Sequence, residues 1–287
     1  MSSSVQDFLQ HDSDRPVGIT ICAVDDITPR LATDALRRSC RKMRFDRAVL
    51  LSSSRPGSLA EGIEHIAIPP ITSHEEYSRF MLHDLHRHID TPHVLIVQWD
   101  GFVLDGSAWD ASFTAYDYIG AVWGGHAQRR VGNGGFSLRS RKLLKAVAQI
   151  APDQPAGRGE DDLICRILAP RLESEFGILF APEAVAHRFA YERVLPDART
   201  FGFHGLFNLW RHLGDDELLQ VIEDLPASVV TGRDFLQCMA CCLGVKRFSM
   251  ARAFVQRLST YVDKDRLDAH FRLIGAKPGF AEFLSKL

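Results

Sequence analysis

Carboxylates close two of the most apolar stretches of this sequence. Residues 17–26 read VGITICAVDD and residues 93–100 read HVLIVQWD, so Asp25 and Asp100 each follow a run of apolar side chains. A carboxylate in this position either closes a turn through its own side chain or binds a divalent cation and the phosphates that the cation carries. Gly101 directly after Asp100 also suits a turn, so both interpretations stay open.

Three further carboxylates stand together in GRGEDDLICRIL, residues 157–168. Glu160, Asp161 and Asp162 fall in the first turn of a predicted helix, where the helix dipole stabilises negative charge. Capping alone does not require three adjacent charges. Their mutual repulsion is expected to raise the pKa of at least one carboxyl group toward a value that suits a general base.

Glycines dominate RRVGNGGFSLRSRK, residues 129–142. The spacing of Gly132, Gly134 and Gly135 allows a ligand to approach the backbone closely, but it matches neither a dinucleotide-binding fingerprint nor a phosphate-binding P-loop. This disfavours a Rossmann dehydrogenase and a kinase. Four arginines flank the glycines and either contact a diphosphate or are simply solvated: Arg129, Arg130, Arg139 and Arg141.

The sequence offers three candidate groups of metal ligands. His204 lies in FGFHG between two glycines, which predicts an accessible imidazole. The histidines of HDLHRH, residues 83–88, do not share one helical face and indicate a polar helix end. The cysteines of CMACC, residues 238–242, have no second pair and have apolar neighbours, which favours a packed helix over half of a zinc site.

Hydrophobic periodicity predicts the elements that position these residues. Apolar runs indicate buried strands within 17–26, 46–54, 63–70 and 93–100, and helical spacing indicates helices within 30–43 and 73–89. This order predicts an α/β fold with a mostly parallel central sheet flanked by helices. Ligands bind outside the carboxyl ends of such strands, where Asp25, Asp26 and Asp100 fall.

The pattern changes after residue 105. Short segments interrupted by glycine come first, followed by predicted helices within 139–150 and 160–172 and by one or two strands within 177–190. From about Leu206 onward the periodicity is helical. The sequence therefore predicts three regions, listed in chain order: a flexible N-terminus at 1–16, a catalytic domain at 17–206 and a small C-terminal helical region at 207–287.

Composition limits the classes of partner. The 287 residues carry a formal net charge of −2, which argues against a sequence-wide attraction to nucleic acid, although a local basic patch stays open. No apolar segment approaches the roughly 20 residues of a transmembrane helix, and the N-terminus lacks the pattern of a secretory signal. Scattered cysteines fit a reducing cytoplasm. We expect a cytoplasmic protein, with a peripheral position at the inner membrane face left open.

Five segments together carry a resemblance to a known class of enzyme. VLIVQWDGFVLD, YDYIGAVW, VGNGGFSLRSRKLL, EDDL and FGFHG follow, in this order, the signatures of the GT-A superfamily of glycosyltransferases. They also resemble a bacterial family of glycosyltransferases formerly labelled as a domain of unknown function. The resemblance covers roughly residues 17–206, and its most specific parts are the glycine loop and the segment around His204. It implies a GT-A-like, Rossmann-like fold.

The resemblance implies a donor and metal site. Gln98, Trp99 and Asp100 stand where GT-A enzymes carry an Asp-x-Asp motif that binds the metal and the donor diphosphate. Gln98 replaces the first aspartate, so one ligand would be an uncharged amide oxygen. His204 matches a late histidine that completes the metal shell in many members. Asp25, at the end of the first strand, is the candidate for contacts with the nucleotide base or ribose.

The resemblance also implies roles for the glycine loop and the acidic cluster. Asn133, Gly134 and Gly135 correspond to the loop that lines the donor sugar and the acceptor. Glu160 and Asp161 resemble a paired acidic motif whose aspartate acts as the base in inverting members. We therefore expect both carboxylates to be catalytic, with Asp161 as the base.

These assignments imply a glycosyltransferase that moves a sugar, with inversion, from a UDP-linked nucleotide-sugar donor to a hydroxyl acceptor. The acceptor would be a glycan, a lipid-linked glycan or a protein, and the cofactor Mn²⁺ or Mg²⁺. No nucleic-acid partner is expected. Two alternatives stay open: a metal-dependent nucleotidyltransferase or phosphohydrolase that uses the same carboxylates, and a non-catalytic module that binds nucleotide sugars.

Overall fold

The computed structural model describes residues 18–57, 59–125, 128–153 and 157–285. The predicted flexible N-terminus, 1–16, lies outside these ranges. The chain separates into two compact units, Met1–His204 and Gly205–Leu287.

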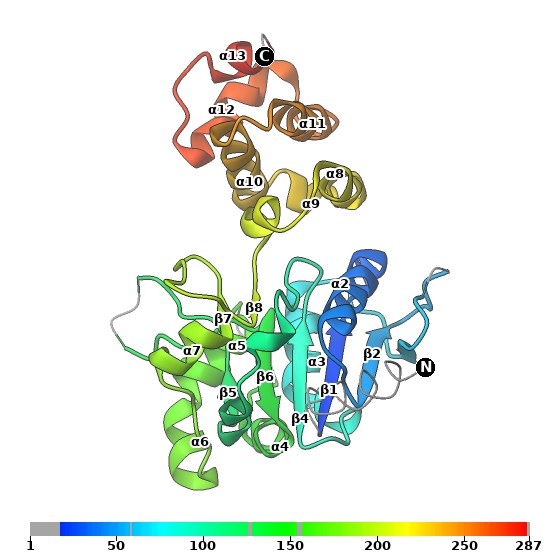
Figure 1. Cartoon of the computed structure of the whole chain (residues 1–287), viewed down its shortest axis with the longest axis vertical. Coiled ribbons are helices and arrows are strands. Elements are labelled where there is room, and N and C mark those ends of the chain that lie inside the picture. The colour runs from blue at the N-terminus through cyan, green and yellow to red at the C-terminus, as the bar shows by residue number, and fades with distance from the viewer. Residues whose placement is uncertain (1–17, 58, 126–127, 154–156, 286–287) are drawn as a thin grey trace, which may run out of the picture. The chain divides into compact units, whose positions relative to one another are not determined.

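A six-stranded sheet forms the centre of the first unit (Figure 1). Its strands are β1 (Ile19–Val24), β2 (Arg47–Ser52), β3 (Glu64–Ala67), β4 (His93–Val97), β5 (Tyr118–Ile119) and β6 (Phe136–Ser140). They lie in the order β3-β2-β1-β4-β6-β5. The first four are parallel, and β6 runs antiparallel to both β4 and β5. The predicted α/β fold with a mostly parallel sheet is therefore confirmed.

Helices cover both faces of this sheet. The α-helices are α2 (Pro29–Lys42), α3 (His74–His83), α4 (Arg141–Ile150), α5 (Glu160–Asp162), α6 (Ala169–Phe176) and α7 (Glu183–Phe189). Short 3-10 helices span Leu85–Arg87, Gly106–Ala108 and Ala111–Ala115, and a π-helical segment spans Leu163–Ile167. As expected for a helix N-terminus, the Ser73 hydroxyl accepts a hydrogen bond from the Glu76 N–H at the start of α3.

Alternation along the strands explains why both faces are covered. In β1, Ile21 packs in one apolar cluster with Leu36 of α2, whereas Cys22 packs in another with Phe80 of α3 and Leu144 of α4. Successive side chains of a strand point to opposite faces, so β1, which is buried along its whole length, must be covered on both.

The prediction of strands within 177–190 is wrong for most of that segment. Glu183–Phe189 forms α7, and only Ala190–Tyr191 forms a strand, β7, which pairs in parallel with β8 (Gly202–Phe203). Three apolar residues of the segment, Val185, Ala186 and Phe189, are buried with helical spacing. A short apolar run of this kind does not distinguish a helix from a strand by periodicity alone.

The second unit is helical, as its periodicity predicts. Its elements are a 3-10 helix (Leu206–Arg211), α8 (Asp215–Asp224), α9 (Ala227–Val230), α10 (Arg233–Gly244), α11 (Phe248–Leu258), a 3-10 helix (Lys264–Arg266), α12 (Leu267–Phe271), a 3-10 helix (Arg272–Ile274) and α13 (Phe280–Ser285). Cys238 and Cys242 are buried in α10, where Phe235 contacts Phe254 of α11 with ring centroids 4.6 Å apart. The packed-helix interpretation of the cysteines is the one that the structure supports.

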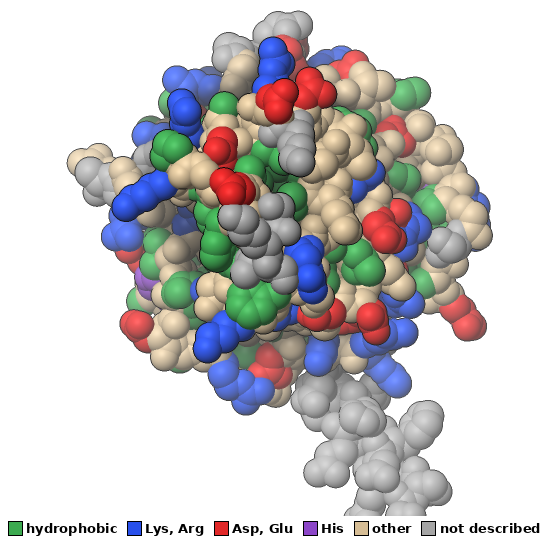
Figure 2. Space-filling model, turned by 90° about the horizontal axis from the view of Figure 1, so that it is seen from above, with side chains coloured by type: hydrophobic (Ala, Val, Ile, Leu, Met, Phe, Trp, Pro, Cys, Tyr) green, Lys and Arg blue, Asp and Glu red, His purple; other side chains and the backbone are tan. Residues whose placement is uncertain are grey.

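Two surface properties concern the classes of partner. On the face shown in Figure 2, basic and acidic side chains are interspersed with hydrophobic ones. Among the helices that the structure describes, none combines the length and the apolar character needed to cross a membrane.

Candidate active site

The turn after β4 carries the first group of predicted site residues. The Gln98 N–H donates to the Gly135 carbonyl and the Gly101 N–H donates to the Gln98 carbonyl, which closes a tight turn around Trp99 and Asp100. Asp100 is only 9% exposed. Backbone groups close this turn, and the Asp100 carboxylate lies beside His204.

His204 joins this turn to a residue that sequence reasoning missed. Its Nε2 atom lies 3.2 Å from Asp100 Oδ1 and 3.2 Å from Gln98 Oε1, and its Nδ1 atom lies 3.5 Å from Glu192 Oε1. The imidazole therefore lies between two carboxylates. Because its side chain is only 15% exposed, the prediction of an accessible histidine is wrong.

A short parallel ladder places Glu192 beside His204. Tyr191 pairs with Phe203 at the ends of β7 and β8, and the His204 N–H donates to the Tyr191 carbonyl. Glu192 and His204 are the next residues along each chain. The segment AYE, residues 190–192, contains this glutamate, but only the pairing of β7 with β8 reveals that Glu192 lies beside His204.

The two carboxylates control the protonation of His204. Burial disfavours the charged imidazole and lowers its pKa, but Asp100 and then Glu192 outweigh burial and raise the pKa to about 10. When Nδ1 carries a proton it can donate to Glu192. When Nδ1 is unprotonated it can accept from the Asn133 amide, whose Nδ2 atom lies 3.1 Å away.

The glycine loop packs against the same imidazole. Asn133 has a left-handed backbone with φ of 64°, which directs the chain into Gly134 and Gly135. A Cβ atom on Gly135 would lie 2.1 Å from His204 Nε2 and 2.7 Å from Gln98 Oε1, and one on Gly134 would lie 2.2 Å from Glu160 Oε1. These glycines are needed because the side chains of the site touch the loop backbone.

Asp161 is held by this loop. Its Oδ2 atom accepts a hydrogen bond of 2.9 Å from the Gly134 N–H, and its Oδ1 atom accepts one of 2.8 Å from the Asp162 N–H. Burial raises the pKa of Asp161, and the charge of Glu160 raises it further. The expected upward shift is therefore present, although burial contributes more than repulsion.

The other two carboxylates of the cluster have different surroundings. Glu160 is buried and accepts a hydrogen bond of 2.9 Å from the fully buried guanidinium of Arg139, which also donates to the Gly134 carbonyl at 3.3 Å. Burial raises the pKa of Asp162, but hydrogen bonds from Arg158 and Arg166 outweigh it and hold that pKa below its usual value. The pKa values of Asp161 and Asp162 are therefore shifted in opposite directions.

The flanking arginines interact with protein carboxylates. Arg139 is fully buried, so the idea that it contacts a diphosphate is wrong for this residue. The other three lie within 4 Å of acidic side chains: Arg129 of Glu173, Arg130 of Glu183 and Arg141 of Asp90.

Tyr77 is a second residue that the sequence did not reveal. Its hydroxyl accepts a hydrogen bond of 3.0 Å from Gln98 Nε2, so the amide oxygen of Gln98 faces His204. Tyr77 lies on α3, 21 positions earlier in the chain. Only the packing of α3 against the sheet brings the two side chains together.

Asp25 and Trp99 stand apart from this network. Both oxygens of Asp25 accept hydrogen bonds from its own loop, from the Ile27 and Thr28 N–H groups and from the Thr28 hydroxyl. Asp25 therefore closes the turn into α2, at the same edge of the sheet as Asp100. Trp99 is half-buried within the Gln98–Gly101 turn.

Some of the side chains of the site are of the types that bind divalent cations. Within the described ranges, no group of three or more His, Cys, Asp or Glu side chains is arranged to hold a metal ion. His204 Nε2 nevertheless lies 3.2 Å from Asp100 Oδ1 and 3.2 Å from Gln98 Oε1. Ligands at right angles, each roughly 2.1 Å from Mg²⁺, lie about 3 Å apart. Each of these two pairs of atoms is therefore spaced like neighbouring ligands of one cation.

Comparisons with known proteins add little to this geometry. Residues 62–204, just under half of the chain, match the family DUF5672, described as a protein of unknown function. No curated protein matches the sequence. Among solved structures, the mannosyltransferase PcManGT from Pyrobaculum calidifontis in complex with GDP-Man and Mn²⁺ is similar over 95% of this chain and 79% of that chain, with 10% identity and a TM-score of 0.43. A likeness this distant carries no conclusion about activity.

Proposed function

We propose that the chain is a GT-A-type glycosyltransferase that moves a sugar from a nucleotide-sugar donor to a hydroxyl acceptor, with inversion at the anomeric carbon. One observation carries the proposal. The turn after β4, the glycine loop, the start of α5 and His204 come from separate parts of the chain and meet through hydrogen bonds at the carboxyl edge of the sheet. Open α/β sheets bind their ligands at this edge.

Asp161 is the proposed general base. Two backbone N–H groups fix its carboxylate, and its raised pKa makes it a better proton acceptor than an ordinary aspartate. The acceptor oxygen forms a bond to the anomeric carbon as the bond from that carbon to the diphosphate breaks. The hydroxyl proton passes to Asp161, and the bonding electrons leave with the nucleoside diphosphate.

Glu160 receives a positioning role in this proposal rather than the catalytic one expected from the sequence. Its ion pair with Arg139 is buried, and Arg139 also contacts the carbonyl of Gly134, whose N–H holds Asp161. The pair therefore fixes the distance between the glycine loop and the base.

Three side chains would hold a divalent cation. Asp100, Gln98 and His204 would bind Mn²⁺ or Mg²⁺, which supplies positive charge beside the departing diphosphate when it is bound. Glu192 would accept the Nδ1 proton of His204 and leave Nε2 free to act as a ligand. Because the Gln98 amide is uncharged, we expect the protein alone to bind the cation weakly.

The proposal is tested by incubating the protein with UDP-linked and GDP-linked sugars, with nucleoside triphosphates as the comparison, in Mn²⁺ or Mg²⁺. Glycan, lipid-linked glycan and protein acceptors are supplied in turn. Release of a nucleoside diphosphate from a UDP-sugar, coupled to sugar transfer, is expected. Turnover of nucleoside triphosphates without transfer would instead support a nucleotidyltransferase or phosphohydrolase.

A second candidate function has one specific observation in its favour. The proton that Asp100 and Glu192 stabilise on His204 competes with a metal ion for Nε2, and the Gln98 amide brings no charge to attract one. A non-catalytic module that binds nucleotide sugars would show calorimetric binding of the donor with no release of the nucleoside diphosphate in the same samples.

A further inference from the structure

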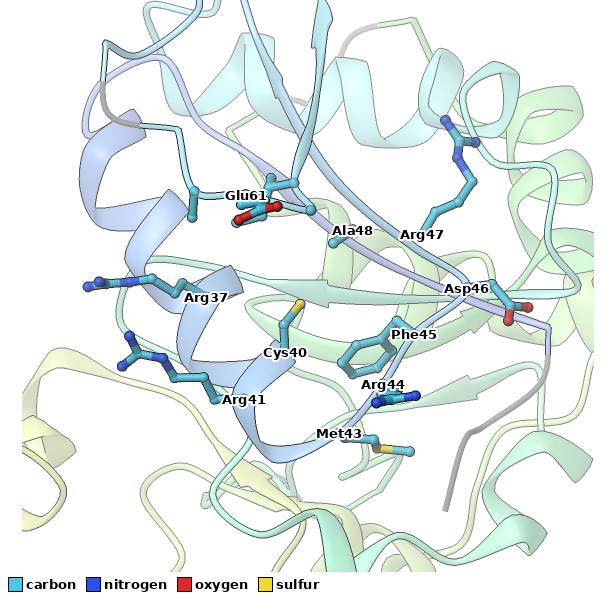
Figure 3. A pocket seen from close by; sticks show the side chains of 13 residues that line it. Arg37, Cys40, Arg41, Met43, Arg44, Phe45, Asp46, Arg47, Ala48 and Glu61 are labelled. Carbon is cyan, nitrogen blue, oxygen red and sulfur yellow. The ribbon is translucent and has the colours of Figure 1, made fainter. Parts of the chain in front are cut away.

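The cavity of about 610 Å³ shown in Figure 3 is separate from the candidate active site. It is lined by residues within 37–48 and 60–63. The side chains of Arg41 and Arg44 extend to opposite sides of it, so the cavity does not gather these charges at one point. The first turn of α3 differs from it, because one side chain of this turn reaches the candidate site.

The first turn of α3 is held by hydrogen bonds on both sides of its start. The Ser73 hydroxyl accepts a hydrogen bond from the Glu76 N–H, and the Glu76 carboxylate accepts hydrogen bonds from the N–H and the hydroxyl of Thr72. The Tyr77 N–H donates to the Ser73 carbonyl. Reciprocal bonds of this kind fix a helix N-terminus. The backbone of Tyr77 therefore has a defined position.

Tyr77 connects the core to the candidate site. Its ring is half-buried and packs against the apolar cluster that contains Phe80 and Ile96. Its hydroxyl accepts a hydrogen bond of 3.0 Å from Gln98 Nε2. Burial raises the pKa of Tyr77 far above its usual value, so the hydroxyl stays neutral and adds no charge to the site. A ring that is anchored in the core holds its hydroxyl, and hence its hydrogen-bond partner, in place.

Gln98 carries two different terminal atoms, and only one of them can bind a cation. Its Oε1 atom lies 3.2 Å from His204 Nε2, among the atoms that the proposed function assigns to the cation. Rotating the amide by half a turn would place its NH₂ group there, and Mg²⁺ and Mn²⁺ bind oxygen rather than such a donor group. A carboxylate presents an oxygen in either orientation and is attracted by the charge of the cation. An amide ligand therefore needs an orienting partner that a carboxylate does not need.

We propose that Tyr77 is a positioning residue of the cation site, whose hydroxyl holds Gln98 Nε2 and so directs Gln98 Oε1 toward the cation. This role rests on the cation site of the proposed function and adds one residue to it. Tyr77 acts through Gln98 and does not itself touch the cation. The hydrogen bond also explains how a glutamine serves at a position where the resemblance implies an aspartate.

The affinity of the full-length protein for Mn²⁺ in the presence of saturating UDP tests this role without turnover. Electron paramagnetic resonance of free Mn²⁺ measures this affinity. Tyr77→Phe keeps the ring and removes the hydroxyl, and should weaken Mn²⁺ binding by about 2- to 10-fold, the effect of one neutral hydrogen bond. Tyr116→Phe removes the hydroxyl of another half-buried tyrosine and should bind Mn²⁺ as the wild type does.

A Gln98→Glu background separates positioning from a general effect on the fold. Both terminal atoms of the glutamate are oxygens, so adding Tyr77→Phe to this background should change the Mn²⁺ affinity by less than about 2-fold, as for two independent sites. An equal loss of affinity in the glutamine and glutamate backgrounds would show that Tyr77 only supports the fold, and would overturn the proposal.

Failure of this role is distinguishable from failure of the cation site. A wild type that binds Mn²⁺ with UDP, together with a Tyr77→Phe variant that binds it equally or more tightly, would overturn the role of Tyr77 and leave the cation site in place. A wild type that binds no Mn²⁺ in the presence of UDP would overturn both.

Discussion

The two units of the chain bury different kinds of side chain. Among the described residues of Met1–His204, the buried charged side chains are Asp100, Asp117, Arg139 and Glu160. In the described part of Gly205–Leu287, Asn208 is the buried polar residue, and the core is built from side chains such as Phe235 and Phe254. Burying a charge costs free energy that pairing only partly offsets. Three of the four buried charges lie at the candidate active site, and the function proposed above gives each of them a role.

The largest expected effect separates catalytic charge from charge that only stabilises the structure. Asp161→Asn should lower sugar transfer by about 10² to 10⁴-fold, because the amide cannot accept the acceptor proton. The rate of nucleoside diphosphate release at saturating donor measures this loss of transfer. Asp162→Asn is the matched control, since Asp162 interacts with two arginines and should remain active. An active Asp161→Asn enzyme with an inactive Asp162→Asn enzyme would show that the wrong carboxylate was chosen.

Breaking the buried ion pair between Arg139 and Glu160 tests how much the pairing of buried charges contributes to the stability of the fold. Arg139→Met leaves Glu160 charged and without this partner in a buried site, and should lower the free energy of unfolding by about 3–5 kcal/mol. Urea titration measures this. Arg171→Met, which breaks an exposed pair with Glu175, should leave the urea midpoint unchanged. Similar midpoints for both variants would show that the buried pair contributes no more to stability than an exposed pair does.

Close packing of the loop is tested at Gly135. The Cβ atom of Gly135→Ala would overlap His204 and Gln98, and the strain should cost about 1–3 kcal/mol of stability. Gly57→Ala is the control, because no atom lies within 4 Å of the added Cβ. Thermal unfolding followed by circular dichroism compares them. A Gly135→Ala protein as stable as Gly57→Ala would mean that the loop is not packed against the imidazole.

A smaller effect concerns pH. The folded protein raises the pKa of His204 from 6.5 to about 10, so it holds this proton more tightly than the unfolded chain does. The resulting stability is complete below pH 6.5 and is lost as the pH rises toward 10. The melting temperature of the wild type should therefore exceed that of His204→Gln by more at pH 6.5 than at pH 10. A constant difference would show that Asp100 and Glu192 do not hold an imidazolium.

The sequence predicts much of the fold because strong patterns act locally. Residues 21–24 and 94–97 are apolar throughout, and the hydroxyl of Ser73 marks the start of α3. The segment around Phe189 shows the limit, since a short apolar run fits a helix or a strand equally well. The π-helical turn after Asp162 has no signal in composition at all.

The site is predictable to the extent that strand ends converge. The rule that parallel strands end at one edge places Asp100 there, but Asn133 precedes the antiparallel β6 and His204 follows β8 of the second sheet. The resemblance, rather than this rule, is what joined Asn133 to the predicted site. Glu192 and Tyr77 could not be predicted, because their contacts with His204 and Gln98 depend on the pairing of β7 with β8 and on the packing of α3. Tertiary contacts of this kind leave no fixed spacing in the sequence.

A crystal structure of the protein soaked with UDP and Mn²⁺ tests the central claim most directly, namely that these segments form one donor site. The account predicts the diphosphate beside the glycine loop, with the cation bound by Asp100, Gln98 and His204. It also predicts the Asp161 carboxylate on the side where an acceptor would approach. Nucleotide bound only away from the glycine loop, or a cation bound away from Asp100, would contradict it.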